Sequence, residues 1–194
     1  MEKIIKKYIS DELKIINNLD IDNICKIMNV LLDALENEKR IFVFGNGGSG
    51  ATASHMQNDF NKAIFEKTDK TFKVQCLNDN MSTVLAIAND EGYDEIFRYQ
   101  LKGVKLNEND IIIAISGSGN SQNIINAVNY GKKVGCKIIG LTGYNGGKLK
   151  ELSNYSFNTN INNMQISEDI HLLLNHLMIW TFYNYLGKKE YCSG

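Results

Sequence analysis

The chain has 194 residues, of which 43% are hydrophobic and 22% are charged, and this is ordinary for a globular protein with one substantial core. A formal net charge of −1 gives no indication of a surface for nucleic acid or a membrane. The longest apolar stretch, residues 172–186, is interrupted by polar side chains and is too short to span a bilayer. We therefore expect one domain over residues 1–194 that binds neither nucleic acid nor membrane.

The four cysteines, Cys25, Cys76, Cys136 and Cys192, are scattered and show no C-x-x-C spacing. Such usage is typical of reduced thiols in a cytosolic protein. The first ten residues, MEKIIKKYIS, contain charges but no apolar core, so no signal peptide is predicted. These two features together predict a cytoplasmic protein.

Residues 1–38 are predicted to form two helices, because apolar residues recur at helical spacing in both halves of this segment. The sequence Asn18-Leu19-Asp20 supplies a break and a cap between them. The first helix precedes the alternating pattern of the remaining chain. We expect it to pack on another subunit.

Residues 41–44, IFVF, form a short apolar run with the length and aromatic content of a buried strand. The run leads into GNGGS, residues 45–49, and then into a helical segment. A glycine turn between a strand and a helix directs backbone N–H groups and the positive end of the helix dipole at one spot, which suits a phosphate. Ser49 adds a hydroxyl donor. The loop matches neither G-x-G-x-x-G nor G-x-x-x-x-G-K-[ST], and a tight turn without a ligand is the alternative.

The helix after this glycine loop carries His55 and Asp59, which are four residues apart and therefore share a face. An imidazole and a carboxylate at this spacing could share a metal ion or a proton. They would lie one to two turns beyond the anion cradle.

Strands and helices then alternate. We expect strands over residues 71–77, 110–116 and 137–142, and an edge strand over 155–159. Helices are expected over 82–88, 93–101, 121–135 and 167–186, with Ser167 as the cap of the last one and a turn at 146–147. This alternation predicts an α/β fold in which a mostly parallel five-stranded sheet is covered by helices on both faces, and in which ligands bind at the carboxyl ends of the strands.

A second segment, ISGSGNS over residues 115–121, has the same arrangement as the first, with a buried strand, a Gly/Ser turn and then a helix. Ser116, Ser118 and Ser121 each offer a hydroxyl donor, and the following helix adds its N-terminal N–H groups. Neutral donors suit a phosphomonoester that must also be released. The alternative is that these serines merely cap the helix.

The last helix carries Glu168, Asp169, His171 and His176 near its beginning. His171 and His176 lie about 140° apart around a helix, so they cannot both face one ligand. Glu168 lies about 60° from His171 and about 80° from His176, so spacing slightly favours Glu168 with His171. A satisfied core histidine remains the alternative for either ring, and spacing leaves the choice open.

Three features together resemble one family. They are GNGGS with the helix that carries His55 and Asp59, then SGSGNS, then EDIHLLLNH over residues 168–176. This set is similar to the SIS (sugar isomerase) domain and, within it, to the phosphoheptose isomerases that act on sedoheptulose 7-phosphate. The similarity includes NDEGY at 89–93 and LTG at 141–143, and it extends from about residue 20 to the C-terminus.

The resemblance implies a flavodoxin-like three-layer α/β/α sandwich and a cytoplasmic homotetramer with active sites at subunit interfaces. It implies a sugar-phosphate substrate and a zinc ion. It assigns substrate contacts to Asn46, Gly47, Gly48, Ser49 and Glu168. It assigns the phosphate to Ser116, Gly117, Ser118 and Ser121, and the sugar hydroxyls to Asn89 and Asp90. The zinc and acid–base positions that it implies are His55, Asp59, Glu168 and His176, which selects His176 over His171.

The chain departs from the family pattern at three positions. Asp59 stands where the family usually has Glu, Glu168 where it usually has Gln, and Gly117 where it often has Thr. A displacement of about 1 Å at a proton-transfer centre can cost on the order of a hundredfold in rate. The alternatives are a substrate that sits differently, a different sugar, or a loss of catalysis.

The function that we expect is the interconversion of a ketose phosphate and an aldose phosphate for heptose and surface-polysaccharide precursors. Asp59, or Glu168 as second choice, would remove the proton beside the carbonyl, and His176 would move a proton at the oxygen. The rivals are an isomerase of another sugar phosphate and a non-catalytic SIS protein that binds a phosphosugar. A nucleotide-binding function is weaker, because no acidic partner for a ribose stands out.

Overall fold

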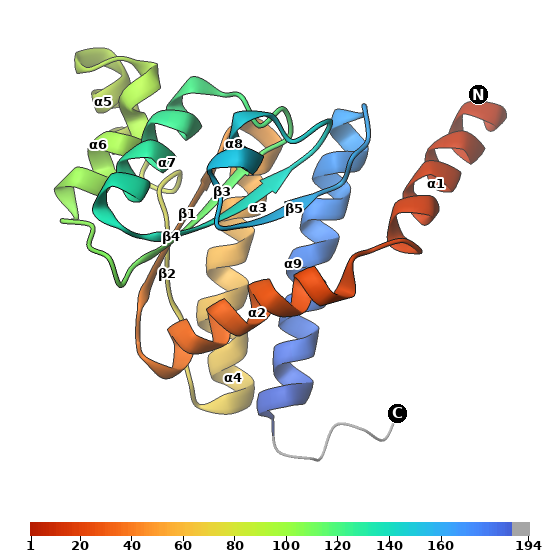
Figure 1. The fold of residues 1–194 in the computed structure, drawn as a ribbon, viewed down its shortest axis with the longest axis horizontal. Coiled ribbons are helices and arrows are strands. Elements are labelled where there is room, and N and C mark those ends of the chain that lie inside the picture. The colour runs from red at the N-terminus through yellow and green to blue at the C-terminus, as the bar shows by residue number, and fades with distance from the viewer. Residues whose placement is uncertain (188–194) are drawn as a thin grey trace.

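Five parallel strands form a single sheet with the order β2-β1-β3-β4-β5. The computed structural model describes residues 1–187. Figure 1 shows the sheet between helices, as the alternating sequence predicts. The strands are β1 (Arg40–Gly45), β2 (Lys73–Cys76), β3 (Ile111–Ser116), β4 (Lys137–Thr142) and β5 (Tyr155–Asn158). The expected fold class is confirmed, and β5 is the edge strand that the sequence predicts.

Both faces of the sheet are buried, because successive side chains of a strand point to opposite faces. In β1, Ile41 and Val43 join one hydrophobic core, whereas Phe42 and Phe44 join the other. Every residue of β3 is buried. A continuous apolar strand such as IIIAI is therefore the sequence signature of a sheet with helices on both sides.

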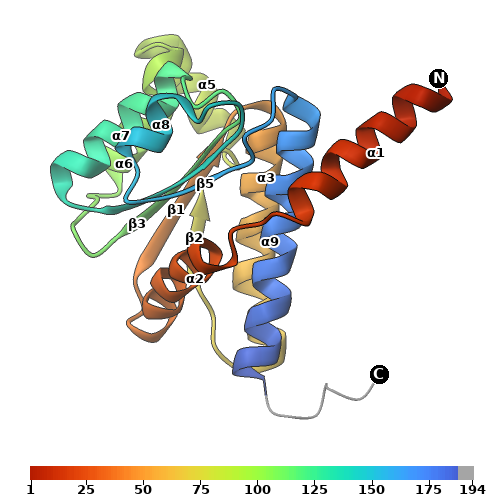
Figure 2. The same ribbon diagram turned by 45° about the vertical axis from the view of Figure 1, so that its right-hand side comes forward.

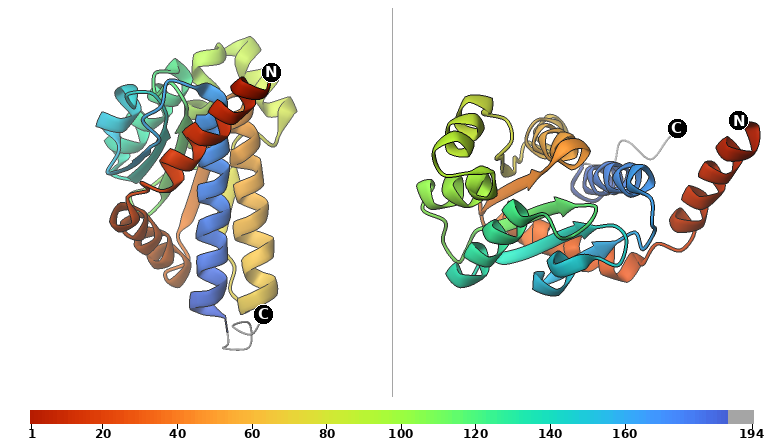
Figure 3. Two further views of the ribbon diagram at one scale, coloured as in Figure 1. Left: turned by 90° about the vertical axis from the view of Figure 1, so that its right-hand side faces the viewer. Right: turned by 90° about the horizontal axis from the view of Figure 1, so that it is seen from above.

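The helices divide between the two faces (Figure 2). One layer contains α2 (Ile21–Glu36), α3 (Gly47–Asn58), the π-helical turn η1 (Asp59–Ala63), α4 (Ile64–Thr68) and α9 (Met164–Leu186). The other contains α5 (Met81–Asp90), the 3-10 turn η2 (Tyr93–Glu95), α6 (Ile96–Gly103), α7 (Gln122–Val134) and α8 (Gly147–Leu152). Figure 3 shows α9 running alongside α3 and α4.

The first helix, α1 (Glu2–Ile16), extends away from the body of the chain and has no buried residue (Figure 1). Its apolar side chains Ile4, Ile5, Ile9 and Leu13 are exposed. It meets α9 where the Tyr8 hydroxyl donates to the Asp169 carboxylate. That contact and the neighbouring apolar surface raise the pKa of Tyr8 to about 12.

The start of the last helix and the segment after residue 146 differ from the sequence-based expectation in an informative way. The last helix begins at Met164 and not at Ser167, because the Asn163 side chain caps it by accepting from the Ile166 N–H. Ser167 is buried within the first turn, where its hydroxyl donates to the Asn163 carbonyl at 2.8 Å. The predicted turn at 146–147 leads directly into the short helix α8. This helix was not predicted, because its N-cap and first residues are glycines, which usually indicate a turn. The predicted cap Asp20 is confirmed at α2.

No helix within residues 1–187 is long and apolar enough to cross a membrane. Cys25, Cys76 and Cys136 are free thiols, and Cys192 lies outside the described residues. Burial raises the pKa of Cys76 and of Cys136 to about 12, so both thiols stay protonated at neutral pH.

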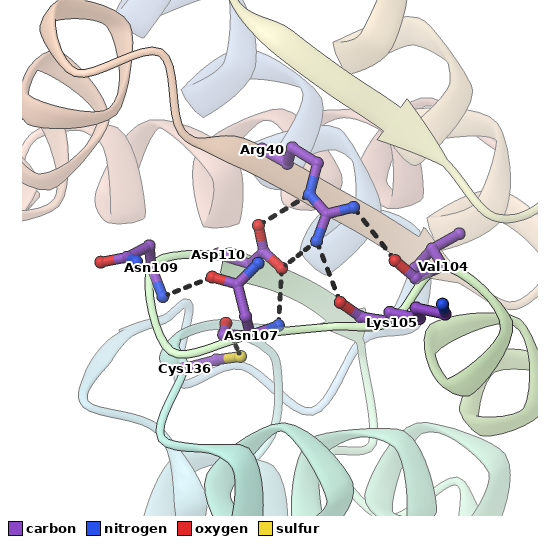
Figure 4. Close-up of polar contacts among 7 residues, drawn as sticks. All are labelled: Arg40, Val104, Lys105, Asn107, Asn109, Asp110 and Cys136. Carbon is purple, nitrogen blue, oxygen red and sulfur yellow. Dashed lines mark hydrogen bonds and ion pairs between the residues drawn. The ribbon is translucent and has the colours of Figure 1, made fainter.

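The amino ends of β1 and β3 are joined by the Arg40–Asp110 clamp (Figure 4). Arg40 donates from Nε and Nη2 to the two carboxylate oxygens of Asp110 at 2.9 and 2.6 Å, and it also donates to the carbonyls of Val104 and Lys105. The Asp110 side chain is 3% exposed and that of Arg40 39%. This bidentate geometry is the strong form of an ion pair.

The unequal exposure of the two partners predicts unequal costs of substitution. Arg40→Met leaves the buried Asp110 carboxylate without its ion-pair partner and is expected to lower the free energy of unfolding by about 3–5 kcal/mol. Asp110→Asn leaves a guanidinium that water can reach, so the expected cost is smaller, about 1–3 kcal/mol. Urea denaturation of both variants measures the difference, and equal losses would contradict this account.

Candidate functional site

The two loops singled out in the sequence meet at one point of the sheet. After β1 the chain crosses to β2 on one side, whereas β3 lies on the other side and leads to β4. The crevice between the carboxyl ends of β1 and β3 is therefore a topological switch point, the usual ligand position in an open α/β sheet. Gly45 and Ile115 are register partners, so both loops start at the same level.

In the first loop, Gly47 has φ of +53°, a left-handed conformation that favours glycine. Gly48 has no room for a side chain, because a Cβ there would collide with the carboxylate of Glu168 from α9. Asn46 is the N-cap residue of α3, yet its side chain makes no capping hydrogen bond. Asn46 thus leaves the N–H groups at the start of α3 uncapped, as an anion cradle requires, and the Glu168 carboxylate lies beside them.

In the second loop, the Ser116 hydroxyl accepts from the Gly119 N–H at 3.1 Å and lies 3.5 Å from the Ser121 hydroxyl. Ser118 accepts from the Asn120 N–H at 3.2 Å. Ser121 is the N-cap residue of α7, but its side chain makes no capping hydrogen bond. The alternative that these serines merely cap the helix is therefore wrong. By contrast, α2, α5 and α9 begin with a capping Asp or Asn side chain.

Asn123 and Tyr93 tie the two loops together, and the sequence analysis missed both. Asn123, on α7, is 1% exposed and exchanges two hydrogen bonds of 2.9 Å with the side chain of Asn46. The Tyr93 hydroxyl also donates to Asn46 at 2.9 Å. This explains why Asn46 does not cap α3. The signal that the sequence offers for Asn123 is an Asn placed two residues after the serine loop.

His55, Asp59 and His176 converge from α3, η1 and α9. The two Nε2 atoms are 3.0 Å apart, and Asp59 Oδ2 lies 3.2 Å from His55 Nε2 and 3.9 Å from His176 Nε2. One ligand atom from each residue lies within 4.8 Å of the others. The side chains of the two histidines are 45% and 56% exposed, whereas that of Asp59 is 14% exposed. Two imidazoles and a carboxylate are a suitable set for a transition metal.

His171 lies away from this group. It is fully buried, and its Nε2 lies 3.1 Å from the Thr142 carbonyl, so Nε2 carries the proton and Nδ1 has no partner. Burial lowers its pKa to about 4. The preference for His171 that spacing gave is therefore wrong. His176 lies beside His55 and Asp59, and its role as a metal ligand or acid–base group stays a prediction. Helical spacing gives only the angles between side chains of one helix. The packing of the helix on the core decides which of those side chains faces the site.

The remaining predicted residues are placed as follows. Glu168 lies over Gly48 and is outside the group of His55, Asp59 and His176, so its role as a fourth metal ligand stays a prediction. Asn89 and Asp90 are exposed at the end of α5, where the Asn89 amide donates to Asp90 at 2.8 Å. No contact joins them to the two loops within the described residues, and their assignment to sugar hydroxyls also stays a prediction.

The arrangement has three parts with separate chemistry. The paired loops offer N–H and hydroxyl donors for an anion, and Glu168 offers a carboxylate at the level of the first loop. The group of His55, Asp59 and His176 offers acid–base groups or metal ligands further along α3 and α9. These are the parts needed to hold a phosphorylated substrate and move protons on it.

Comparison with known proteins gives consistent relatives. The family model described as SIS domain matches residues 6–143. A Thermoplasma acidophilum protein named "Probable phosphoheptose isomerase" is 33% identical over 89% of this chain and 94% of its own length. A phosphoheptose isomerase from Helicobacter pylori (strain Shi470) is 33% identical over 78% of each chain. The solved phosphoheptose isomerase from Neisseria gonorrhoeae superposes with a TM-score of 0.83 at 26% identity, covering 93% of this chain and 95% of its own.

His171 predicts a specific acid sensitivity. Its pKa is about 4 in the folded chain against 6.5 when unfolded, so its neutral form favours folding fully above pH 6.5, and this contribution is lost as the pH falls toward 4. His171→Gln keeps a donor for Thr142 but cannot be protonated. Between pH 7 and pH 5 the wild type should lose about 2 kcal/mol more stability than this variant. Urea titrations at both pH values measure it, and parallel losses would contradict the assignment.

Proposed function

This chain belongs to the SIS domain family, and from that premise we propose that it is a cytoplasmic aldose–ketose isomerase of a sugar phosphate. We take sedoheptulose 7-phosphate as the substrate, with a heptose 7-phosphate as product for surface-polysaccharide precursors, because the relatives are named phosphoheptose isomerases. The observation that carries the proposal is the convergence of His55, Asp59 and His176 beside two uncapped strand-to-helix loops.

The phosphate would dock on the serine loop. The hydroxyls of Ser116, Ser118 and Ser121 and the N–H groups at the start of α7 supply neutral donors there. The glycine loop lies beside it across the Asn46–Asn123 pair, and its N–H groups would hold oxygens of the sugar. Asn89 and Asp90 complete the proposed contacts with the sugar hydroxyls.

The chemistry would be proton transfer through an enediol. Asp59, or Glu168 as second choice, removes the proton from the carbon beside the carbonyl, and His176 moves a proton on or off the oxygen. Returning the proton to the neighbouring carbon completes the interconversion of ketose and aldose. The carboxylate of Glu168 faces the first loop, while Asp59 is further along the helix, so the two candidates act at different depths of the site.

The residues present fit a zinc ion. His55, Asp59 and His176 form the two-histidine, one-carboxylate set of open catalytic zinc sites. Glu168, the fourth ligand that the resemblance implies, lies over Gly48 outside this group. Bound zinc would polarise the carbonyl of the substrate and ease enolisation. The two imidazole Nε2 atoms lie 3.0 Å apart, a distance that fits both an N–H···N hydrogen bond and two ligands of one cation.

The first test is proton NMR of sedoheptulose 7-phosphate with the zinc-supplied protein in deuterated water. We expect deuterium at the carbons beside the carbonyl together with an aldose product. Exchange without product would keep the chemistry but require another sugar. If a folded, metal-loaded sample gives no exchange, weight shifts to a different sugar phosphate or to a non-catalytic phosphosugar-binding protein.

Asp59→Asn separates catalysis from binding in the same assay. The amide keeps the shape of the carboxylate but cannot accept the proton, so turnover should fall by roughly a hundredfold or more. Binding of the sugar phosphate, followed by isothermal titration calorimetry, should persist because the serine loop is untouched. Normal turnover in this variant would show that Asp59 is not the base.

We also propose a homotetramer with active sites at subunit interfaces, supported by the exposed apolar side chains of α1 and by the half-exposed His55 and His176. Light scattering should give four times the mass of the chain. Ile5→Asp combined with Ile9→Glu, both on exposed positions of α1, should lower that mass without unfolding the chain. A wild-type monomer would contradict the proposal.

A further inference from the structure

Asn175 is a polar residue in an apolar setting. It is fully buried on α9, between Leu174 and His176, and the core around it includes Met178 and Ile179. Its Nδ2 donates to Asp59 Oδ2 at 2.7 Å, whereas its Oδ1 has no hydrogen-bond partner. Burying an unpaired acceptor lowers stability, so a leucine at this position would serve the core better. The amide is therefore not explained by folding.

The partner of Asn175 is the carboxylate at the centre of the candidate site. Asp59 Oδ2 is the same atom that lies 3.2 Å from His55 Nε2 and 3.9 Å from His176 Nε2. The terminal torsion of an aspartate is broad, so a short carboxylate does not hold one rotation by itself. The Asn175 amide, which donates to Oδ2, restricts that rotation.

The backbone at Asp59 is also unusual. The helix changes from α3 to the π-helical turn η1 at this residue, and the Ile64 N–H donates to the Asp59 carbonyl five residues back. Such π turns are rare and recur at functional sites. The turn and the Asn175 amide act on the same residue from two sides, one through its backbone and one through its carboxylate.

We propose that Asn175 is a positioning residue that holds the Asp59 carboxylate toward His55 and His176. It touches neither the substrate nor the metal, and it acts through Asp59. For catalysis, the proposal rests on the isomerase function proposed above. For the geometry of the carboxylate and for metal affinity, it stands without that function.

The test compares Asn175→Leu with the wild type in three measurements. We expect kcat to fall about 10–100-fold with KM within about twofold, because the base is displaced while the phosphate loops are intact. The zinc dissociation constant, measured by competition with a chromogenic chelator, should rise by roughly tenfold or more. The melting temperature should change little, because the lost hydrogen bond to Asp59 is offset by removal of the unpaired buried acceptor. Asn184→Leu on the exposed end of α9 is the matched control and should leave kcat and zinc affinity unchanged.

The outcomes separate this proposal from the isomerase proposal. If the wild type turns over no sugar phosphate, the isomerase function fails, and the zinc affinities and the crystal structures of wild type and variant still decide the role of Asn175. Asp59 Oδ2 should leave the histidine pair in the crystal structure of Asn175→Leu. An unmoved carboxylate with unchanged zinc affinity would overturn the proposal. A loss of kcat that only follows a lowered melting temperature would also overturn it, because Asn175 would then be structural.

Discussion

Parallel pairing of β1 with β3 is the constraint on which the site depends. Gly45 and Ile115 are register partners, so the glycine loop and the serine loop begin side by side at one edge of the sheet. The chain leaves these two strands toward opposite edges, and the crevice between them stays open to a ligand. The reciprocal hydrogen bonds of Asn46 and Asn123 then bridge the crevice and fix the separation of the two loops. A sheet with another strand order would contain the same loops without bringing them together.

The second constraint is the length of α9 beside α3. Glu168 reaches the first loop at Gly48, and His176, eight residues later, lies about 12 Å further along the helix beside His55. One helix therefore supplies a carboxylate at the level of the loops and an imidazole to the group of His55, Asp59 and His176. The Asn163 cap sets where this helix begins and hence which residues reach each level.

Much of the fold follows from local sequence signals. Apolar runs such as IIIAI identify strands buried on both faces, and the glycine and serine turns identify where the strands end. The sequence could not choose between His171 and His176, because spacing gives only their relative angle, and the packing of residues such as Leu174 and Met178 sets the rotation of α9. Asn123 and Asn175 were missed because each gains its meaning from a partner far away in the chain, Asn46 and Asp59. Local patterns in the sequence do not report contacts between residues so far apart.

The two ends of the sheet differ in how completely their polar groups are paired. At the amino ends, Arg40 and Asp110 satisfy each other and the neighbouring carbonyls. Within residues 1–187, the buried side-chain atoms without a partner, His171 Nδ1 and Asn175 Oδ1, both lie on α9, one turn apart. Each such atom costs about 1–3 kcal/mol, a large share of the stability of a typical domain. The helix that carries His176 is thus the element where function is expected to oppose folding.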